Sequence, residues 1–205
     1  MTASWSAPGA ARVVLASLPM LLWTAGCDLV VAPTVAPPAT MPVVWSTTPL
    51  PMDPAMAAAA ERAGSTCQQA NQPVRVVVGD RRTAGVAAFI LENATRLDSC
   101  VFTFVDGRIA AGGATDGELV GPAGLLTAEV GMGSHIDGVG DVRLLGGRVV
   151  EGAVSVQVSL ADGRFLTASI AAGWWLASWP GTAGVTRAVA FDASGAVIAT
   201  VEQPK

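Results

Sequence analysis

The last third of the chain carries the clearest pattern of hydrophobic and polar positions. From Val154 to Leu160, valine or leucine occupies every second position, with serine or glutamine between them. This period of two predicts a β-strand with one buried face. The alternation repeats over residues 165–170, after Asp162-Gly163. We therefore expect a strand, a turn and a returning strand.

Short apolar runs separated by glycine, proline and aspartate extend this pattern towards the N-terminus and the C-terminus. We expect Gly79-Asp80 to form a turn after the first of these runs. The segment 112–147 is rich in glycine and predicts only weak strands, around residues 119–120, 125–130 and 143–145. The remaining predicted strands span residues 74–78, 86–91, 100–105, 108–111, 174–179, 187–191 and 196–201. Together they predict a mainly β fold, as an antiparallel sandwich, a barrel or a layered meander.

One short helix is expected before the strands. Asp53 is a good N-cap, and Pro54 suits the first helical turn because its missing N–H would be unsatisfied there. Residues 55–63 are rich in alanine, the strongest helix former. Gly64 is expected to end or fray the helix, although it could resume towards Gln69. The globular domain is therefore predicted to cover residues 54–205.

A different pattern marks the N-terminus. Arg12 precedes a mainly apolar run of 11 residues, Val13 to Trp23, which is followed by three small residues and Cys27. A membrane-spanning helix needs about 20 apolar residues, so this run is too short to be one. A basic start, an apolar middle and small residues before a cut are the layout of a secretory signal.

This stretch resembles the lipobox of bacterial prolipoproteins, in which the cysteine after the cut becomes lipid-modified. Thr24 stands where that family usually has leucine, valine or isoleucine. The resemblance implies a signal peptide over residues 1–26 and a lipid on Cys27. It also implies attachment to the extracytoplasmic face of the cell membrane. The alternatives are an ordinary cleaved signal peptide or a buried helix, with Cys27 incidental.

Residues 27–53 are expected to form a tether after the lipidated cysteine. Six prolines occur between residues 28 and 51, and proline favours extended polyproline II structure. At about 3.1 Å per residue this segment would reach at most ~75 Å. Trp45 and Val43-Val44 are unusually apolar for a linker, so they either dock on the domain or remain exposed.

Length and charge limit the remaining choices. Removing residues 1–26 from 205 leaves 179 residues, enough for one ordinary domain or two small ones. Arg12 leaves with the signal, so 11 basic residues face 16 acidic ones, a net charge of −5. No basic patch of the kind that neutralises nucleic-acid phosphates is present in the sequence, so we expect no nucleic-acid partner.

The other two cysteines form an even pair in a chain that is predicted to be exported. Disulfides persist outside the cytoplasm, so we expect Cys67 and Cys100 to be bonded. On the chain-entropy model such a bond contributes roughly 3–4 kcal/mol, less any strain. The alternative is two buried thiols. We expect no metal or other cofactor, because there is no Cys-x-x-Cys and the single histidine, His135, has no cysteine nearby in sequence.

The tryptophans of residues 174–179 are the most distinctive candidate for a binding site. On a strand, Trp174, Leu176 and Ser178 share one face, and Trp175 and Trp179 share the other. Our hypothesis is that Trp175 and Trp179 form an exposed pair that stacks on sugar rings or anchors a protein partner. The alternative is that both faces are packed between two layers.

Catalytic motifs are scarce. The segment 131–140 has neither the spacing of a phosphate-binding loop nor a Gly-Lys-Ser/Thr motif. His135 lies next to Ser134 and near Asp137, but triad residues usually come from distant segments, so we interpret it as a solvated loop histidine. The four Asp-Gly pairs lack the pattern of a calcium loop and are better explained as turns. Two of the 16 acidic residues could still meet in the fold as paired catalytic carboxylates.

The C-terminal third has a second resemblance. The segments 154–163, 173–181 and 190–195 are similar to a segment of uncharacterised exported actinobacterial proteins. This implies an extracytoplasmic β domain and no particular activity. We therefore expect a non-catalytic cell-envelope lipoprotein that binds a protein partner or a cell-wall polymer. The alternatives are an envelope hydrolase that uses carboxylates or His135, and a structural module without a small ligand.

Overall fold

The computed structural model describes residues 44–67, 73–93, 97–105, 108–117, 126–128 and 130–202. The expected signal, Cys27 and most of the expected tether lie outside these residues. Within them, no helix is both long enough and apolar enough to cross a membrane.

The fold is mainly β, as predicted. One helix and twelve strands are present in the described part of the chain. The strands form three four-stranded antiparallel sheets, with the orders β1-β2-β3-β4, β5-β6-β10-β9 and β12-β11-β7-β8. None of these sheets closes into a barrel. The bounds are α1 Pro54–Cys67, β1 Arg75–Arg81, β2 Val86–Glu92, β3 Leu97–Val105, β4 Arg108–Gly117, β5 Val130–Ile136, β6 Gly140–Arg148, β7 Ser155–Leu160, β8 Phe165–Thr167, β9 Ser169–Ala171, β10 Trp174–Pro180, β11 Val185–Phe191 and β12 Val197–Glu202.

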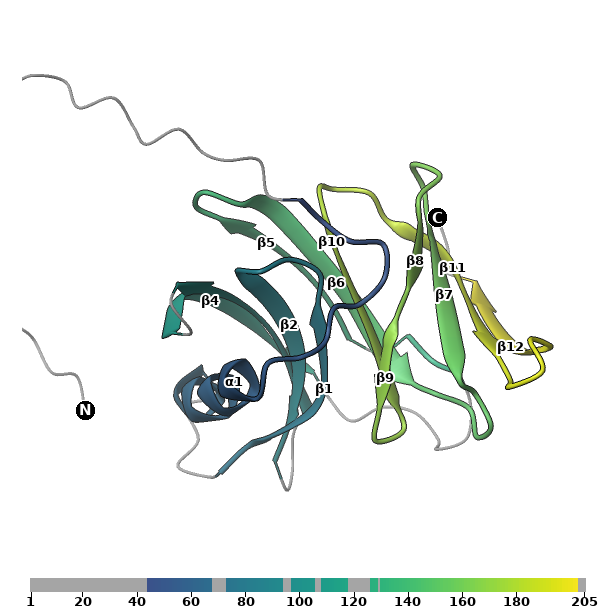
Figure 1. Cartoon of the computed structure of the whole chain (residues 1–205), viewed down its shortest axis with the longest axis horizontal. Coiled ribbons are helices and arrows are strands. Elements are labelled where there is room, and N and C mark those ends of the chain that lie inside the picture. Colours follow the sequence, from purple (N-terminus) through teal and green to yellow (C-terminus); the bar gives the residue numbers. More distant parts are fainter. Residues whose placement is uncertain are drawn as a thin grey trace, which may run out of the picture. The chain divides into compact units, whose positions relative to one another are not determined.

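The three sheets are stacked in layers, and the second sheet lies between the other two (Figure 1). Trp174 and Leu176 of β10 pack into an apolar cluster shared with the first sheet. Trp175 and Ala177, on the opposite face of β10, pack into a cluster shared with the third sheet. A further cluster joins the outer face of the first sheet to α1 through Met56 and neighbouring side chains. The second sheet is therefore buried on both faces where β10 runs.

Helix α1 begins as predicted and ends later than predicted. The Asp53 carboxylate accepts a hydrogen bond from the backbone N–H of Ala55 at 2.8 Å, which is the contact of an N-cap. Gly64 does not end the helix, which continues to Cys67. A Cβ at position 64 would lie 2.5 Å from Leu91 Cδ1 and 2.8 Å from Val74 Cγ2. Gly64 therefore lets the helix approach the sheet closely.

The two cysteines that were expected to pair lie on two elements that pack together, α1 and β3. Cys67 is the last residue of α1, and its side chain is outside the described part. Cys100 lies on β3 and is buried in the cluster that packs against α1. The disulfide stays a prediction, with both residues on elements that pack together.

The folded part begins earlier than residue 54. Residues 44–52, which we call the strap, were assigned to the tether, but most of them lie against the sheets. Leu50 forms a β-bridge with Arg81, and its N–H donates to the Arg81 carbonyl at 2.7 Å. Trp45 packs against the cluster between the first two sheets, whereas Val44 is 83% exposed. The folded domain therefore includes residues that the sequence pattern assigned to the tether.

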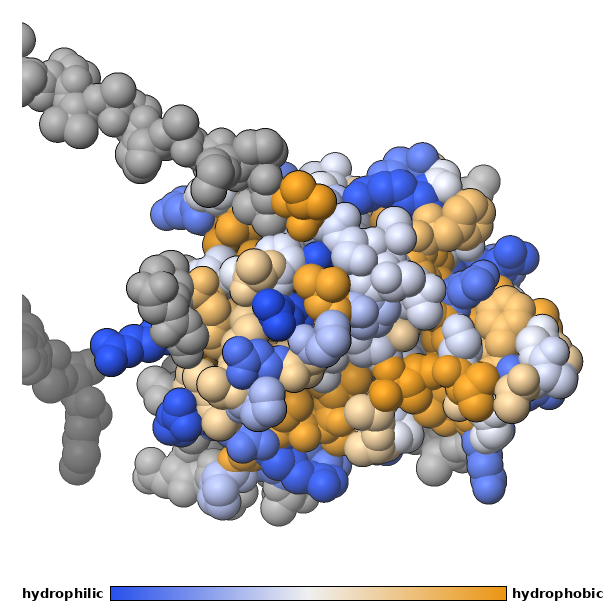
Figure 2. Space-filling view, viewed as in Figure 1, coloured by the Kyte–Doolittle hydropathy of each residue, from blue (hydrophilic) through white to orange (hydrophobic). Residues whose placement is uncertain are grey.

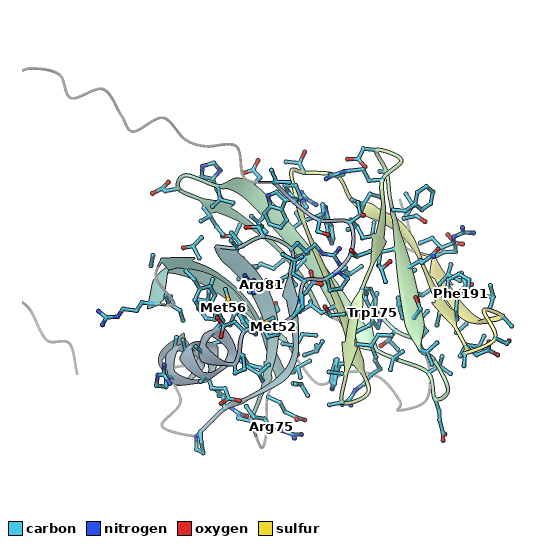
Figure 3. All side chains as sticks on the ribbon, viewed as in Figure 1. Met52, Met56, Arg75, Arg81, Trp175 and Phe191 are labelled. Carbon is cyan, nitrogen blue, oxygen red and sulfur yellow. The ribbon has the colours of Figure 1, made fainter. Side chains whose placement is uncertain are left out.

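Strand β1 runs through Gly79 and Asp80, where the sequence predicted a turn. A Cβ on Gly79 would lie 2.6 Å from Met52 Cε, so the glycine allows the strap to cross close to the strand. Figure 3 shows Met52 beside Met56 near α1. Asp80 is fully buried on the opposite face of β1. The presence of Gly79 and Asp80 at these positions is therefore explained by close packing and burial within β1 rather than by a turn.

The predicted returning strand over residues 165–170 is divided between two sheets. Residues Phe165–Thr167 pair with β7, and Ser169–Ala171 pair with β10. Ala168 lies at the change of direction, and its N–H donates to the Val156 carbonyl at 2.8 Å. The chain therefore connects the third sheet to the second at this point.

Candidate functional site

The hypothesis that Trp175 and Trp179 form an exposed pair is wrong. Trp175 is 0% exposed and Trp179 is 2% exposed. Their indole N–H groups donate to backbone carbonyls, Trp175 to Thr127 at 2.8 Å and Trp179 to Ala183 at 2.9 Å. Figure 3 shows Trp175 between the second and third sheets. The third sheet covers the face that these residues share, so the alternative of packing between two layers is confirmed.

A buried ion pair joins the first two sheets. The side chains of Asp80 and Arg82 are both 0% exposed, and Arg82 Nε lies 2.8 Å from Asp80 Oδ2. The Asp80 carboxylate also accepts hydrogen bonds from the Ser169 hydroxyl at 2.8 Å, and from the hydroxyl and N–H of Ser178 at 2.6 and 2.8 Å. A buried carboxylate is stable only when paired and hydrogen-bonded in this way.

Every N–H donor of Arg82 has an acceptor. Besides Asp80, the guanidinium donates to the carbonyls of Ser46 at 3.3 Å, Thr47 at 2.7 Å and Thr167 at 2.6 Å. An arginine has five N–H donors, so none remains for a ligand. The pair therefore connects the strap to both sheets and has a structural role.

The open polar surface lies instead on the β5–β6 hairpin. The sequence predicted a glycine-rich loop with weak strands here, but residues 130–148 form two regular strands joined by a turn at 137–139. Met132 and Ile136 of β5 point into the cluster shared with the first sheet. The alternating residues therefore occupy the other face of the hairpin. They are Gly131, Gly133 and His135 on β5, opposite Leu145, Arg143 and Asp141 on β6.

A groove runs between this face and the β10–β11 connection. It consists of two adjoining hollows of about 270 and 250 Å³, and both are lined by Gly133 and Arg143. The first includes the side chains of Leu145, Trp179 and Val185. The second includes those of His135, Asp141 and Thr182. The groove therefore has apolar side chains at one end and polar side chains at the other, and Arg143 lines both.

His135 pairs with a residue that the sequence did not suggest. Its Nδ1 lies 2.7 Å from Asp141 Oδ1, and the two side chains are 68% and 48% exposed. Ser134 shares the alternation of Met132 and Ile136, so it faces away from His135. No hydroxyl group is hydrogen-bonded to His135 within the described residues. The arrangement has the orienting half of a catalytic triad but lacks a nucleophile joined to the histidine.

Arg143 is the most distinctive group of the groove. Its side chain lies across Gly133, because a Cβ built there would be 3.7 Å from Arg143 Cγ and 3.8 Å from Nε. Arg143 is half-buried, and in the part of the chain that the structure describes its guanidinium has no hydrogen bond or ion pair. A guanidinium is suited to two-pronged binding of a carboxylate. Arg143 can therefore contact an acidic group that enters the groove.

The carboxylates with shifted pKa values do not form a catalytic pair. The Arg164 side chain hydrogen-bonds Asp162 and lowers the pKa of that carboxyl. The Ser194 hydroxyl and the N–H of Ala196 lower the pKa of Asp192. Both acids lie on surface turns and have lowered pKa values, whereas a general acid needs a raised pKa in a pocket. Among the described residues, no group of three or more His, Cys, Asp or Glu could hold a metal ion.

Two larger hollows are weaker candidates for a binding site than the groove. One, of about 570 Å³, is lined mainly by apolar residues of the β6–β7 connection and by Ile170. The other, of about 510 Å³, contains Arg75 and Glu92, which already form an ion pair with a 2.6 Å contact. On the face shown in Figure 2, hydrophobic surface gathers over the lower half, among charged residues. The one charged residue of the first hollow, Glu151, is exposed to solvent, and the two charges of the second hollow pair with each other.

Comparison with known proteins finds no match to a family model, a curated protein or a solved structure.

Sequence reasoning named His135 but missed Asp141 and Arg143. A usable signal was present: apolar residues with even spacing occur at Met132 and Ile136 and again at Val142 and Leu144, on either side of Asp137-Gly138. That pattern is typical of a hairpin, and the frequent glycines obscured it.

Proposed function

We propose that the protein is a non-catalytic lipoprotein of the cell envelope that binds a partner in the groove between the β5–β6 hairpin and the β10–β11 connection. The observation that carries this proposal is Arg143, a half-buried guanidinium without a described partner in a groove with an apolar end. Binding sites commonly combine apolar surface with a few polar groups that fix orientation. The groove is open to solvent, as a site for a macromolecular partner requires.

The location rests on the N-terminal sequence. The signal-like pattern that ends at Cys27 supports export and lipid attachment to the extracytoplasmic face of the membrane. The strap is docked from Trp45 onward, so the 17 residues 28–44 remain as the tether. At about 3.1 Å per residue in extended form they would reach ~50 Å. The groove would then meet partners close to the membrane.

Lipid attachment is tested with an alkyne-bearing fatty acid fed to cells that make the full chain. The chain should become labelled and fractionate with membranes, and Cys27→Ser should abolish the label. Unlabelled parent chain in the soluble fraction would contradict the lipoprotein assignment. The same preparations test the disulfide, because Cys67 and Cys100 should resist thiol alkylation until a reductant is added.

Partner binding is tested by crosslinking in intact cells, followed by recovery of the protein. Arg143→Glu reverses the charge in the groove. Arg187→Glu makes the same change on β11, where Arg187 is exposed and lies opposite Glu202. The first variant should lose the crosslinked partner while the second keeps it. Equal recovery by both variants would show that the groove is not the binding surface.

A second candidate function is hydrolysis of a wall polymer by His135. The observation that favours it is the 2.7 Å contact with Asp141, which could orient the imidazole as a general base for a water molecule. Purified protein incubated with cell-wall polymer should release soluble fragments if this is correct. His135→Ala should then stop the release, and an inactive parent protein would rule out this candidate.

A further inference from the structure

Strand β5 is the outermost strand of the second sheet (Figure 1). The directions of its backbone N–H and C=O groups follow from those of its neighbour β6. The Asp141 carbonyl of β6 accepts a hydrogen bond at 2.7 Å from the N–H of Gly181, the residue that directly follows β10. Asp141 therefore directs its backbone towards β10 rather than towards its partner His135. Antiparallel pairs alternate between hydrogen-bonded and non-hydrogen-bonded. It follows that Gly131, Gly133 and His135 direct their N–H and C=O groups to the outer edge.

The same three residues line the groove with their side-chain face. The cross-strand pairs give the groove a fixed order, with Gly131 beside Leu145, Gly133 beside Arg143 and His135 beside Asp141. Because glycine has no side chain, the Leu145 side chain of β6 reaches over Gly131 and the Arg143 side chain lies over Gly133, so both extend towards the outer edge of β5. A strand added at the edge would place every second side chain on this face. The edge and the groove therefore form one surface.

We propose that β5 receives an extended segment of a protein partner as an additional strand, with an acidic side chain opposite Gly133 and an apolar side chain opposite Gly131. The acidic side chain would meet Arg143, and the apolar one would contact Leu145, whose side chain reaches over Gly131. This inference rests on the proposed function and specifies the kind of partner. Strand addition provides affinity through main-chain hydrogen bonds and specificity through alternate side chains.

Two features favour a peptide over a sugar polymer. Sugar rings are commonly bound by exposed aromatic faces, and the tryptophans of β10 are buried. Edge strands that avoid pairing usually carry charged side chains or proline. Strand β5 has no lysine, arginine, acidic residue or proline in its sequence, Val-Gly-Met-Gly-Ser-His-Ile. The outer edge of β5, with which no described strand pairs, therefore lacks both kinds of protection against strand addition.

The test uses the full chain, labelled with ¹⁵N in detergent micelles, and two acetylated, amidated octapeptides. Their sequences are Ser-Thr-Val-Thr-Glu-Thr-Thr-Ser and Ser-Thr-Glu-Thr-Val-Thr-Thr-Ser, which present the two side chains in either chain direction. One of them should shift the backbone amide signals of Gly131, Gly133 and His135 saturably. Replacing its glutamate by glutamine should weaken binding about tenfold, since a charge-assisted contact is lost. Saturable shifts elsewhere, or none, would overturn the proposal.

Position 133 supplies a matched pair of variants. Gly133→Pro removes an N–H that points away from β6, so the hairpin is retained while the edge loses a donor. Gly133→Ala retains that donor and adds a Cβ at ordinary contact distance from Arg143. The proline variant should bind the peptide at least tenfold more weakly than the alanine variant. Equal binding by two folded variants would show that no strand is added.

Arg143→Gln completes the comparison. It should weaken the glutamate peptide about tenfold and leave the glutamine peptide nearly unchanged. If the peptides fail to bind while crosslinking in cells still depends on Arg143, strand addition is wrong and the proposed binding function stands. If a peptide binds as described but crosslinking is independent of Arg143, the edge accepts strands and the proposed function fails.

Discussion

Arg82 holds Asp80 by two hydrogen bonds, from Nε to Oδ2 at 2.8 Å and from Nη2 to Oδ1 at 3.1 Å, between the first and second sheets. The strap, the second sheet and Thr167 of β8 all contribute hydrogen-bond partners to this pair. A charge-assisted network of this kind positions the strap against the layers. The strap is thus part of the folded domain.

Breaking the buried pair should destabilise the protein strongly. Arg82→Met leaves the Asp80 carboxylate buried without its cation, and such losses cost about 3–5 kcal/mol. Urea unfolding measures the change in the free energy of unfolding. Arg75→Ala is the control, because Arg75 is 70% exposed in its ion pair with Glu92 and should cost less than about 1 kcal/mol. Similar losses in the two variants would contradict the structural role given to the Arg82 network.

Removing the strap should destabilise the domain, although the sequence placed it in the tether. A chain that begins at residue 54 lacks the Ser46 and Thr47 carbonyls that Arg82 contacts, and leaves two donors of a buried guanidinium without acceptors. Each unsatisfied buried group costs about 1–3 kcal/mol. A chain that begins at residue 44 retains these contacts. The shorter chain should unfold at a lower temperature, and equal melting temperatures would show that the strap adds nothing.

The tryptophans of β10 should behave as core residues. Trp175→Ala removes a fully buried side chain and leaves the Thr127 carbonyl without its donor, so we expect a loss of about 3–5 kcal/mol. Phe165→Ala is the matched control, since Phe165 is 63% exposed, and should change stability by about 0.5 kcal/mol or less. A Trp175→Ala variant as stable as the parent would contradict the assignment of Trp175 to the core.

Asp192 should titrate below an ordinary aspartate. Its carboxylate accepts hydrogen bonds from the Ser194 hydroxyl and the N–H of Ala196, at 2.6 and 2.9 Å, which lower its pKa. Because the pKa of Asp192 is lower in the folded state than in the unfolded state, its carboxylate stabilises the folded protein at pH values above the unfolded-state pKa. This contribution is lost as the pH falls through the folded pKa. A carboxyl ¹³C titration between about pH 2 and 6 measures the value, and Ser194→Ala should raise it. An unchanged value in that variant would contradict the stated cause.

The strands of the C-terminal third were predictable because their local pattern and their environment agree. Val156 and Val158 alternate with polar residues, and β7 has one buried face. The burial of Trp175 and Trp179 was not predictable, because a strand covered on both faces and a strand with one exposed aromatic face can have the same sequence alternation. Only the presence of the third sheet decides between them.

Glycine caused the other errors, for one physical reason. Gly64, Gly79 and Gly133 look like breakers in sequence. In the structure, the first two allow close contacts and the third lies under the Arg143 side chain. Such contacts join residues far apart in the chain, so local patterns do not reveal them. The same limit hid Asp141 as the partner of His135, and the strap as the partner of Arg82.

The central claim, that the groove beside β5 binds a partner, is tested most directly by site-specific photo-crosslinking in cells that make the full chain. A photoreactive amino acid replaces Thr182, which lines the polar end of the groove, or Ser194, which lies on the distant β11–β12 turn. The account predicts a discrete crosslinked protein from position 182, none from position 194, and loss of the product in an Arg143→Gln background. A product from position 182 that survives this substitution, or the same product from both positions, would contradict the claim.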